Sequence, residues 1–222
     1  MFTKPDSRRC KIVSFSGMDG AGKSTQIKSL HVYMEEAGFR VRLITFWDDV
    51  ASFTRMREVA GHKLFNGDKG VGTPAAPINR RDKNVRSWLM SLIRLGMYFV
   101  DAVSLRIVLK KALHSNADFI ICDRYIYDEL ANLTLHNSAV RIYARFIMKI
   151  APRPNISYLL DADPVQARAR KPEYPVEFLY ICRASYLTLS NLVAGGMTII
   201  PPMPVQDVEQ LVFQYANDLL IL

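Results

Sequence analysis

The chain alternates between short apolar runs and longer segments whose apolar positions recur at helical spacing. The short runs are rich in β-branched and aromatic residues, and they predict buried strands at 10–16, 40–46, 118–123, 155–161 and 197–200. Strands that alternate with helices typically form a mostly parallel sheet with helices on both faces. Ligands of such sheets bind beyond the carboxyl ends of the strands, so the residues that follow each strand are the first candidates for function.

The segments between these runs predict helices of very different length. Ile27, Leu30 and Met34 give the first one an apolar face, and Gly38 is a candidate C-terminal cap. A pattern over 85–114 is long enough to need a kink or two helices. The remaining helices are expected at 127–150, from Pro164, and over 175–192 and 205–222. For 47–84 we expect a short helix around 51–60 and then a mobile loop.

One glycine-rich turn lies between the first strand and the first helix, in the stretch "SGMDGAGKST". It matches G-x-x-x-x-G-K-[ST], and the strand before it and the helix after it are the context that distinguishes a phosphate loop from a chance glycine turn. Its amides and the helix N-terminus form an anion site. Lys23 is predicted to reach the β- and γ-phosphates of ATP, and Ser24 to bind Mg²⁺. The predicted ATP-binding residues are Gly17, Met18, Asp19, Gly20, Ala21, Gly22, Lys23, Ser24 and Thr25.

Charge and composition narrow the choice of partners. The 222 residues, most simply one domain, carry a net charge of +8, but the basic residues form no long run or aromatic-interleaved stripe. We therefore expect a phosphorylated small molecule and no nucleic acid. No signal peptide or membrane-spanning run is visible, and Cys10, Cys122 and Cys182 lack metal-ligand spacing. These features predict a cytoplasmic protein without a membrane partner.

The third predicted strand ends in "CDRYIYDE". An acidic residue directly after an apolar strand, in a chain with a phosphate loop, is placed to organise Mg²⁺, so Asp123 is the candidate. Arg124 beside it offers a forked pair of donors to a phosphate. The alternative is a surface turn in which the two side chains form an ordinary ion pair.

A basic cluster follows the fourth strand, in "LLDADPVQARARK". Phosphoryl transfer needs positive charge around the transferred group and exclusion of water, and a mobile basic lid supplies both. We expect this lid at about 165–176, with Arg168 and Arg170 as catalytic cations. The alternative is a solvated helix face.

These three segments together resemble the thymidylate kinases, which are P-loop nucleoside monophosphate kinases. The resemblance covers most of residues 10–192 and is carried by "MDGAGKST", "DRY" and the lid region. It implies a three-layer P-loop NTPase fold with ATP and Mg²⁺ as cofactors. The reaction would be phosphorylation of dTMP or a related (deoxy)nucleotide to the diphosphate. Family members are commonly homodimers joined through long helices, so the apolar span 85–109 is a candidate interface as well as a candidate core helix.

The resemblance also assigns roles to individual residues. Asp19 matches an acidic residue that faces the acceptor's sugar, and Lys23 and Ser24 match the pair that binds ATP and Mg²⁺. Asp123 and Arg124 match an Asp–Arg pair near the two phosphate groups. Because the loop itself contains no arginine, the catalytic positive charge is expected from the lid.

The chain departs from the family where the acceptor base is bound. The usual Arg-Glu-Pro-Gly-Gly segment is replaced by "FWDDVASFTR". In "MYFVDAVSLR" the thymine-contacting arginine aligns with Asp101 or Ala102, and its phenylalanine partner with Met97 or Tyr98. The acceptor base therefore stays open. The candidate acceptor-binding residues are Asp19, Trp47, Asp48, Tyr98, Asp101 and Arg124.

Two other functions stay open at this stage. A nucleoside or other small-molecule kinase would need a base for an alcohol acceptor, and Asp48 or Asp49 stands where related deoxynucleoside kinases carry one. A non-catalytic regulatory module would bind nucleotide through the loop but would need neither Arg124 nor the lid arginines.

Overall fold

A five-stranded parallel sheet forms the centre of the molecule. The computed structural model describes residues 10–51 and 88–221. Its strands run in the order β2-β3-β1-β4-β5, and each neighbouring pair is parallel. Their bounds are Lys11–Ser16 (β1), Val41–Thr45 (β2), Phe119–Asp123 (β3), Ile156–Leu160 (β4) and Thr198–Ile200 (β5). The predicted strands are thus confirmed to within one or two residues at each end.

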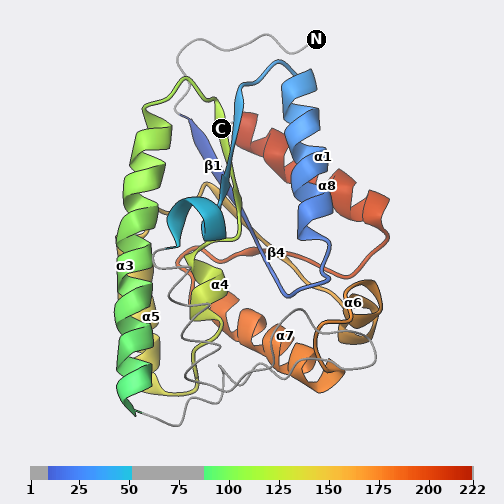
Figure 1. Cartoon of the computed structure of the whole chain (residues 1–222). Helices are drawn as coiled ribbons and strands as arrows, with labels where there is room; N and C mark the ends of the chain where they lie inside the picture. Colours follow the sequence, from blue (N-terminus) through green and yellow to red (C-terminus); the bar gives the residue numbers. More distant parts are fainter. Residues whose placement is uncertain (1–9, 52–87, 222) are drawn as a thin grey trace.

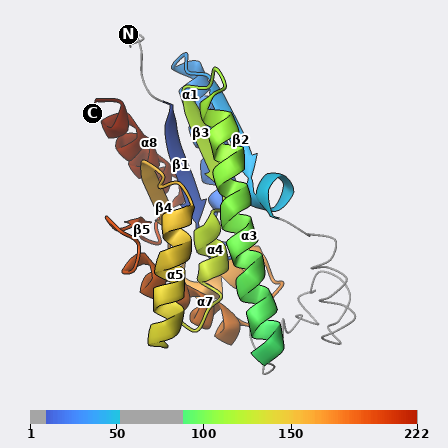
Figure 2. The ribbon, with the colours of Figure 1, turned by 90° about the vertical axis from the view of Figure 1, so that its left-hand side faces the viewer.

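Helices cover both faces of this sheet (Figures 1 and 2). One face packs against α1 (Lys23–Glu36) and α8 (Val205–Ile221). The other packs against α3 (Trp88–Leu113), α4 (Ile126–Leu130), α5 (Ser138–Ile150) and α7 (Val176–Ser190). Side chains of β1 alternate between the two cores, with Ile12 in one and Val13 and Phe15 in the other. The predicted three-layer α/β fold is confirmed.

The structure decides between the alternatives for one helix and corrects the boundaries of another. For 85–114 we expected a kink or two helices, and the described part of this span forms one helix, α3, of 26 residues. The helix expected over 127–150 is two helices, α4 and α5. The side chain of Asn132 donates to the carbonyl of Asp128, and that of Asn137 accepts from the amide of Ala139. Such side-chain bonds compete with the helical pattern and begin α5 anew.

Other local predictions agree with the structure. Gly38 has φ 84°, and its amide and that of Phe39 bond to the carbonyls of Glu35 and Met34, so it caps α1 as expected. The predicted helix around 51–60 and the loop after it lie outside the described residues. The end of β2 instead continues into a short π-helix, η1 (Phe46–Val50). Among the described helices, none is both long and apolar enough to cross a membrane.

Candidate active site

The phosphate loop connects β1 to α1 at the carboxyl end of the sheet. Gly17 and Gly20 have φ of 146° and 82°, which side chains rarely adopt. A Cβ at Gly17 would lie 2.6 Å from the carbonyl oxygen of Leu160, and one at Gly20 would lie 2.3 Å from that of Ala167. The end of β4 and the helix α6 (Pro164–Arg170) therefore press on the loop, and only glycine fits.

Lys23 lies inside this loop and does not extend into solvent. Its side chain is buried, with the residue 7% exposed, and Nζ donates to the carbonyls of Gly17 at 2.7 Å and Met18 at 2.9 Å. Burial, and then the charge of Arg124, lower the pKa of Lys23 to about 8, against the opposite effect of nearby carboxylates. The loop's own carbonyls therefore hold the ammonium in place. Ser24 and Thr25 are exposed in the first turn of α1.

Asp123 ends β3 beside the loop, paired in register with Phe15 of β1 and Thr45 of β2. Burial raises the pKa of its carboxyl, and the charges of Asp128 and Asp48 add to this, while Arg124 and Lys23 oppose it. No hydrogen bond or ion pair joins its carboxylate to another residue of the described ranges. An oxygen ligand among several carboxylates suits Mg²⁺, and Ser24 supplies an exposed hydroxyl at the same end of the sheet. No larger cluster of metal-ligating side chains occurs within 10–51 and 88–221.

Arg124 lies between two carboxylates, from the loop and from α4. Its Nη2 donates to Asp19 at 2.5 Å and its Nη1 to Asp128 at 3.3 Å. Burial opposes the charged form, but these carboxylates outweigh it and raise the pKa of the guanidinium. In turn, burial alone would raise the pKa of Asp19, yet Arg124, Lys23 and Lys171 lower it. Both groups are therefore charged at neutral pH, and ion pairs join Arg124 to Asp19 of the loop and to Asp128 of α4.

The predicted acceptor residues on η1 and α3 differ in their exposure. Trp47 and Asp48 are exposed on η1, and Asp49 accepts from the amide of Thr45 at 2.7 Å. Tyr98 and Asp101 on α3 are 5% and 0% exposed, so both side chains belong to the interior. Asp101 raises the pKa of Tyr143 together with burial. A contact between the acceptor and Tyr98 or Asp101 stays a prediction, because neither side chain is exposed to solvent in this structure.

The lid segment begins with α6, directly on the phosphate loop. Asp163 caps this helix by accepting from the amides of Val165 and Gln166, both at 3.0 Å. Arg170 is exposed and donates to the carbonyl of Gly20 at 3.1 Å, and Arg168 is half-buried. The two predicted lid arginines thus lie on the helix that covers the loop.

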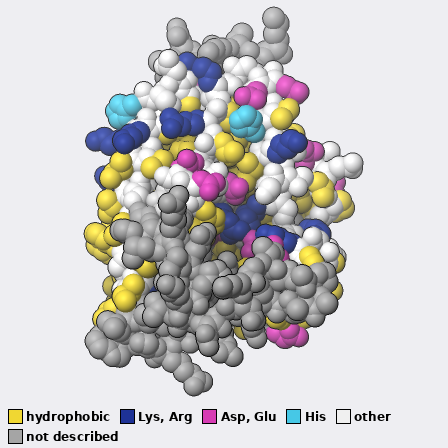
Figure 3. All heavy atoms as spheres, in the orientation of Figure 1, with side chains coloured by type: hydrophobic (Ala, Val, Ile, Leu, Met, Phe, Trp, Pro, Cys, Tyr) yellow, Lys and Arg dark blue, Asp and Glu magenta, His cyan; other side chains and the backbone are white. Residues whose placement is uncertain are grey.

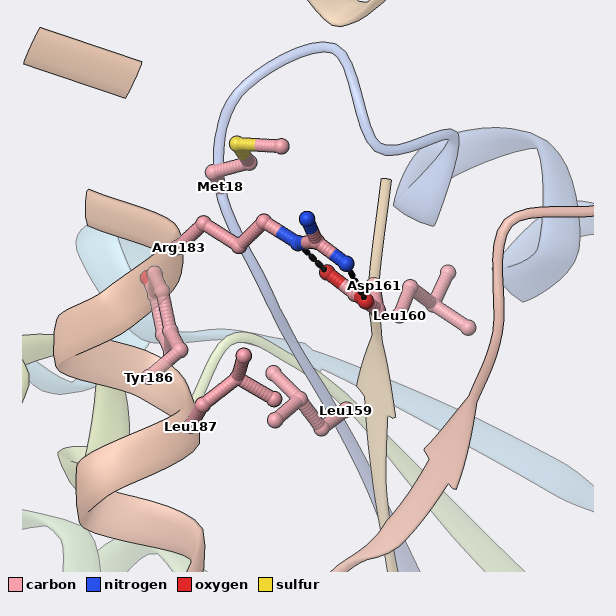
Figure 4. A pocket seen from close by; sticks show the side chains of 7 residues that line it. All are labelled: Met18, Leu159, Leu160, Asp161, Arg183, Tyr186 and Leu187. Atoms are coloured by element: carbon pink, nitrogen blue, oxygen red, sulfur yellow. Dashed lines mark hydrogen bonds and ion pairs between the residues drawn. The ribbon is translucent and has the colours of Figure 1, made fainter. Parts of the chain in front are cut away.

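A bidentate ion pair closes the base of the lid segment. Arg183 of α7 donates to both carboxylate oxygens of Asp161, at 2.7 Å each, directly after β4. Figure 4 shows this pair across a small pocket beneath Met18 of the loop, with Tyr186 on the same helix. On the face in Figure 3, Lys and Arg side chains lie beside Asp and Glu side chains near the middle of the molecule. At the site itself, Arg124 and Lys23 lie close to Asp19 and Asp128, so its charge is mixed.

Sequence reasoning missed Asp128 and Arg183. The signal for Asp128 was its place four residues after Arg124, in the first turn of the helix that follows the Asp–Arg pair. Arg183 had no such signal, because its partner Asp161 is 22 residues away and precedes the lid.

Comparisons with known proteins agree with this geometry. No known family profile matches the chain. A probable thymidylate kinase of Methanosphaera stadtmanae is 25% identical over 205 residues, covering 89% of this chain and 92% of that protein. One from Thermococcus gammatolerans is 28% identical over 188 residues, covering 81% and 83%. The fold matches a thymidylate kinase of Ehrlichia chaffeensis with a TM-score of 0.60 at 18% identity, over 95% of this chain and 99% of that one. Over most of its length the chain is therefore similar in sequence to probable thymidylate kinases, and it shares the fold of a solved thymidylate kinase.

Proposed function

We propose that the chain transfers the γ-phosphoryl group of ATP to the phosphate of a nucleoside monophosphate, dTMP or a related (deoxy)nucleotide. The observation that carries this proposal is the meeting of three segments at one end of the sheet. The phosphate loop, the Asp123–Arg124 pair and the lid helix α6 contribute Lys23, Arg124 and Arg170 around the same loop backbone. Such transfer depends on positioning and on positive charge, which is what this arrangement offers.

On the ATP side, the amides of residues 17–25 would bind the phosphates, in the way that a loop at a helix N-terminus binds anions. The ammonium of Lys23 would exchange its two carbonyl partners for phosphate oxygens. Ser24 and Asp123 would hold Mg²⁺, which when bound neutralises charge between the β- and γ-phosphates. Because the pKa of Lys23 is about 8, most molecules carry a protonated, positively charged Lys23 at neutral pH.

On the acceptor side, Arg124 would bind the acceptor phosphate and Asp19 would face its sugar. Because a phosphate acceptor is already anionic, this reaction needs no general base. Trp47 and Asp48 are exposed at the edge of the site, where a base or sugar could contact them. Asp101 or Ala102 stands where the family carries an arginine, so we do not restrict the base to thymine.

The lid would complete the site. We propose that residues 165–176 act as a lid within a single domain and that Arg168 and Arg170 carry charge to the transferred group when it closes. The Asp161–Arg183 pair supports this assignment, since it anchors the segment at its two ends and leaves α6 between them.

We also infer that two copies associate through α3 and α5, which lie side by side (Figure 2). Phe99 and Phe146 stack with ring centroids 6.3 Å apart, and they are 43% and 51% exposed. Ile107 and Ile142 extend this apolar face, at 50% and 66% exposed. Light scattering after size exclusion should give the mass of a dimer, and a Phe146→Asp variant the mass of a monomer.

The decisive experiment for the activity is a panel of nucleosides and nucleoside monophosphates with ATP and Mg²⁺, scored for release of ADP. We expect release with a monophosphate. Release with nucleosides alone would favour the alcohol-acceptor reaction with Asp48 as base, since Asp49 already accepts from Thr45. Nucleotide binding without release from any acceptor would favour a regulatory module.

A further inference from the structure

A buried carboxylate that the proposed reaction does not use lies at the centre of the site. Asp128 is on α4, and its side chain is only 2% exposed. Carboxylates are almost never this buried unless charged or polar partners satisfy them. The hydrogen-bond partners of Asp128 should therefore explain why a charged residue occupies this buried position.

The two oxygens of Asp128 accept hydrogen bonds from three elements. Oδ1 accepts from Tyr186 of α7 at 2.8 Å and from Arg124 at 3.3 Å. Oδ2 accepts from the hydroxyl of Ser16, the last residue of β1, at 2.7 Å and from the amide of Tyr125 at 3.1 Å. One carboxylate thus joins the strand that enters the phosphate loop, the Asp–Arg turn and the helix that follows the lid.

Arg124 is held from both sides by this arrangement. Its guanidinium spans Asp128 and Asp19, and its amide donates to the carbonyl of Phe15 at 3.0 Å. Its backbone has φ 67°, and among the described residues it is the only one other than glycine in this region. A non-glycine residue stays there only when its surroundings enforce it. The site therefore fixes both the backbone and the side chain of Arg124.

We propose that Asp128 is a positioning residue for phosphoryl transfer, which holds the guanidinium of Arg124 toward the acceptor phosphate and links it through Tyr186 to the helix behind the lid. This inference rests on the proposed function. Asp128 itself touches no substrate, and its effect on the reaction passes through Arg124. A carboxylate suits this purpose because two oxygens can accept four hydrogen bonds in fixed directions, and one of them comes from a cation.

A double-mutant cycle between Asp128→Asn and Arg124→Ala tests this. Asp128→Asn keeps the shape but removes the charge and one acceptor. We expect it to lower kcat about tenfold or more, with little change in the KM for ATP. In the Arg124→Ala background the same substitution should have no further effect on kcat. Equal effects in both backgrounds would overturn the inference, because Asp128 would then act independently of Arg124.

Matched variants separate positioning from simple support of the fold. Ser16→Ala removes one partner of Oδ2 and leaves Arg124 paired. It should lower the melting temperature and leave kcat close to the wild-type value. Tyr186→Phe removes one partner of Oδ1 and serves in the cycle if Asp128→Asn does not fold. We expect its effect on kcat also to vanish in the Arg124→Ala background.

Binding measurements keep the two proposals distinguishable. The affinity for a nucleoside monophosphate, measured by calorimetry, gives a second cycle that needs no turnover. If the wild-type chain binds the monophosphate but transfers no phosphate, the proposed reaction fails and this cycle still decides the role of Asp128. If transfer occurs and the cycle shows no coupling, only the role of Asp128 fails.

Discussion

Two regions face each other across the phosphate loop, and they are built in opposite ways. The Arg124 cluster consists of Arg124, Asp19 and Asp128, whose side chains are 22%, 24% and 2% exposed, and both carboxylates pair with the guanidinium. The lid helix α6 has seven residues, and Arg170 at its end is exposed. The backbone of α6 comes so close to Gly20 that a Cβ there would meet the carbonyl of Ala167, and Arg170 donates to the carbonyl of Gly20.

This difference separates two tasks of a phosphotransferase. Charges that bind phosphate before the reaction must stand in place, and burial with several hydrogen bonds per group achieves this. Charges that act only in the closed state must be able to move away from the site when it opens. A short, exposed helix held by the Asp161–Arg183 pair permits such movement. The two regions should therefore respond differently to substitution.

The largest effect is expected from the lid. Arg168→Ala with Arg170→Ala should lower kcat about 10³-fold, because a mobile arginine in phosphoryl transfer contributes at least that much. Either single variant should be milder if the two share the role. Steady-state kinetics at saturating acceptor would measure kcat, and calorimetry the affinity for ATP, which should change little.

Arg42→Ala, exposed on the edge strand β2, is the matched control and should leave both kcat and the affinity for ATP unchanged. Normal turnover of the double variant, or a rise only in the KM for ATP, would show that α6 is not a catalytic lid.

Lys23 tests the fixed region at the ATP side. Lys23→Ala should lower kcat about 10²-fold or more, since it removes a positive charge aimed at the transferred group. Unlike the lid variants, it should also weaken ATP binding, because this side chain is in place before closure. Lys28→Ala, exposed on the same helix, should match the wild type in both measurements. Retention of turnover by Lys23→Ala would refute the phosphate-loop assignment.

Asp123 tests the proposed metal site. Asp123→Asn should reduce kcat on the order of 10²-fold and move the Mg²⁺ titration to higher concentration, because an amide is a weaker ligand than a carboxylate. Activity against Mg²⁺ concentration is the measurement, with the exposed Asp207→Asn as control. An unchanged titration midpoint would mean that Asp123 is structural.

The smallest effect is expected in the pH dependence of stability. It tests the burial of Lys23 in the fixed region and does not involve the lid. The pKa of Lys23 in the folded chain is about 8, below the ordinary lysine value of 10.5 that applies to the unfolded chain. Between these values the unfolded chain binds more protons, so the free energy of unfolding rises with pH. Between pH 7.5 and pH 10, the free energy of unfolding of the wild type should rise by about 2 kcal/mol more than that of Lys23→Met. Denaturant titrations would measure it, and parallel curves would contradict burial of the ammonium.

Local features of the chain were predictable because they depend on neighbours in sequence. The apolar runs specified the strands, and Gly38 ended α1, since each depends on the backbone preferences of a few adjacent residues. The glycines and Lys23 identified the loop, and Asp123 and Arg124 fell at the end of β3 as expected. The break between α4 and α5 was missed, because Asn132 and Asn137 bond to nearby backbone in a way that apolar spacing does not reveal.

By itself, the sequence determined the order of the elements, the position of the phosphate loop and the kind of chemistry that its residues allow. Only the tertiary structure decided how the charges are paired. Ser16 and Asp128 are 112 residues apart, and Arg170 reaches Gly20 across 150. Tertiary packing also buried Lys23 and Asp101, which the sequence left as accessible site residues. The physical reason is that burial and ion pairing depend on where distant segments meet, and a parallel sheet brings together the carboxyl ends of strands that are far apart in the chain.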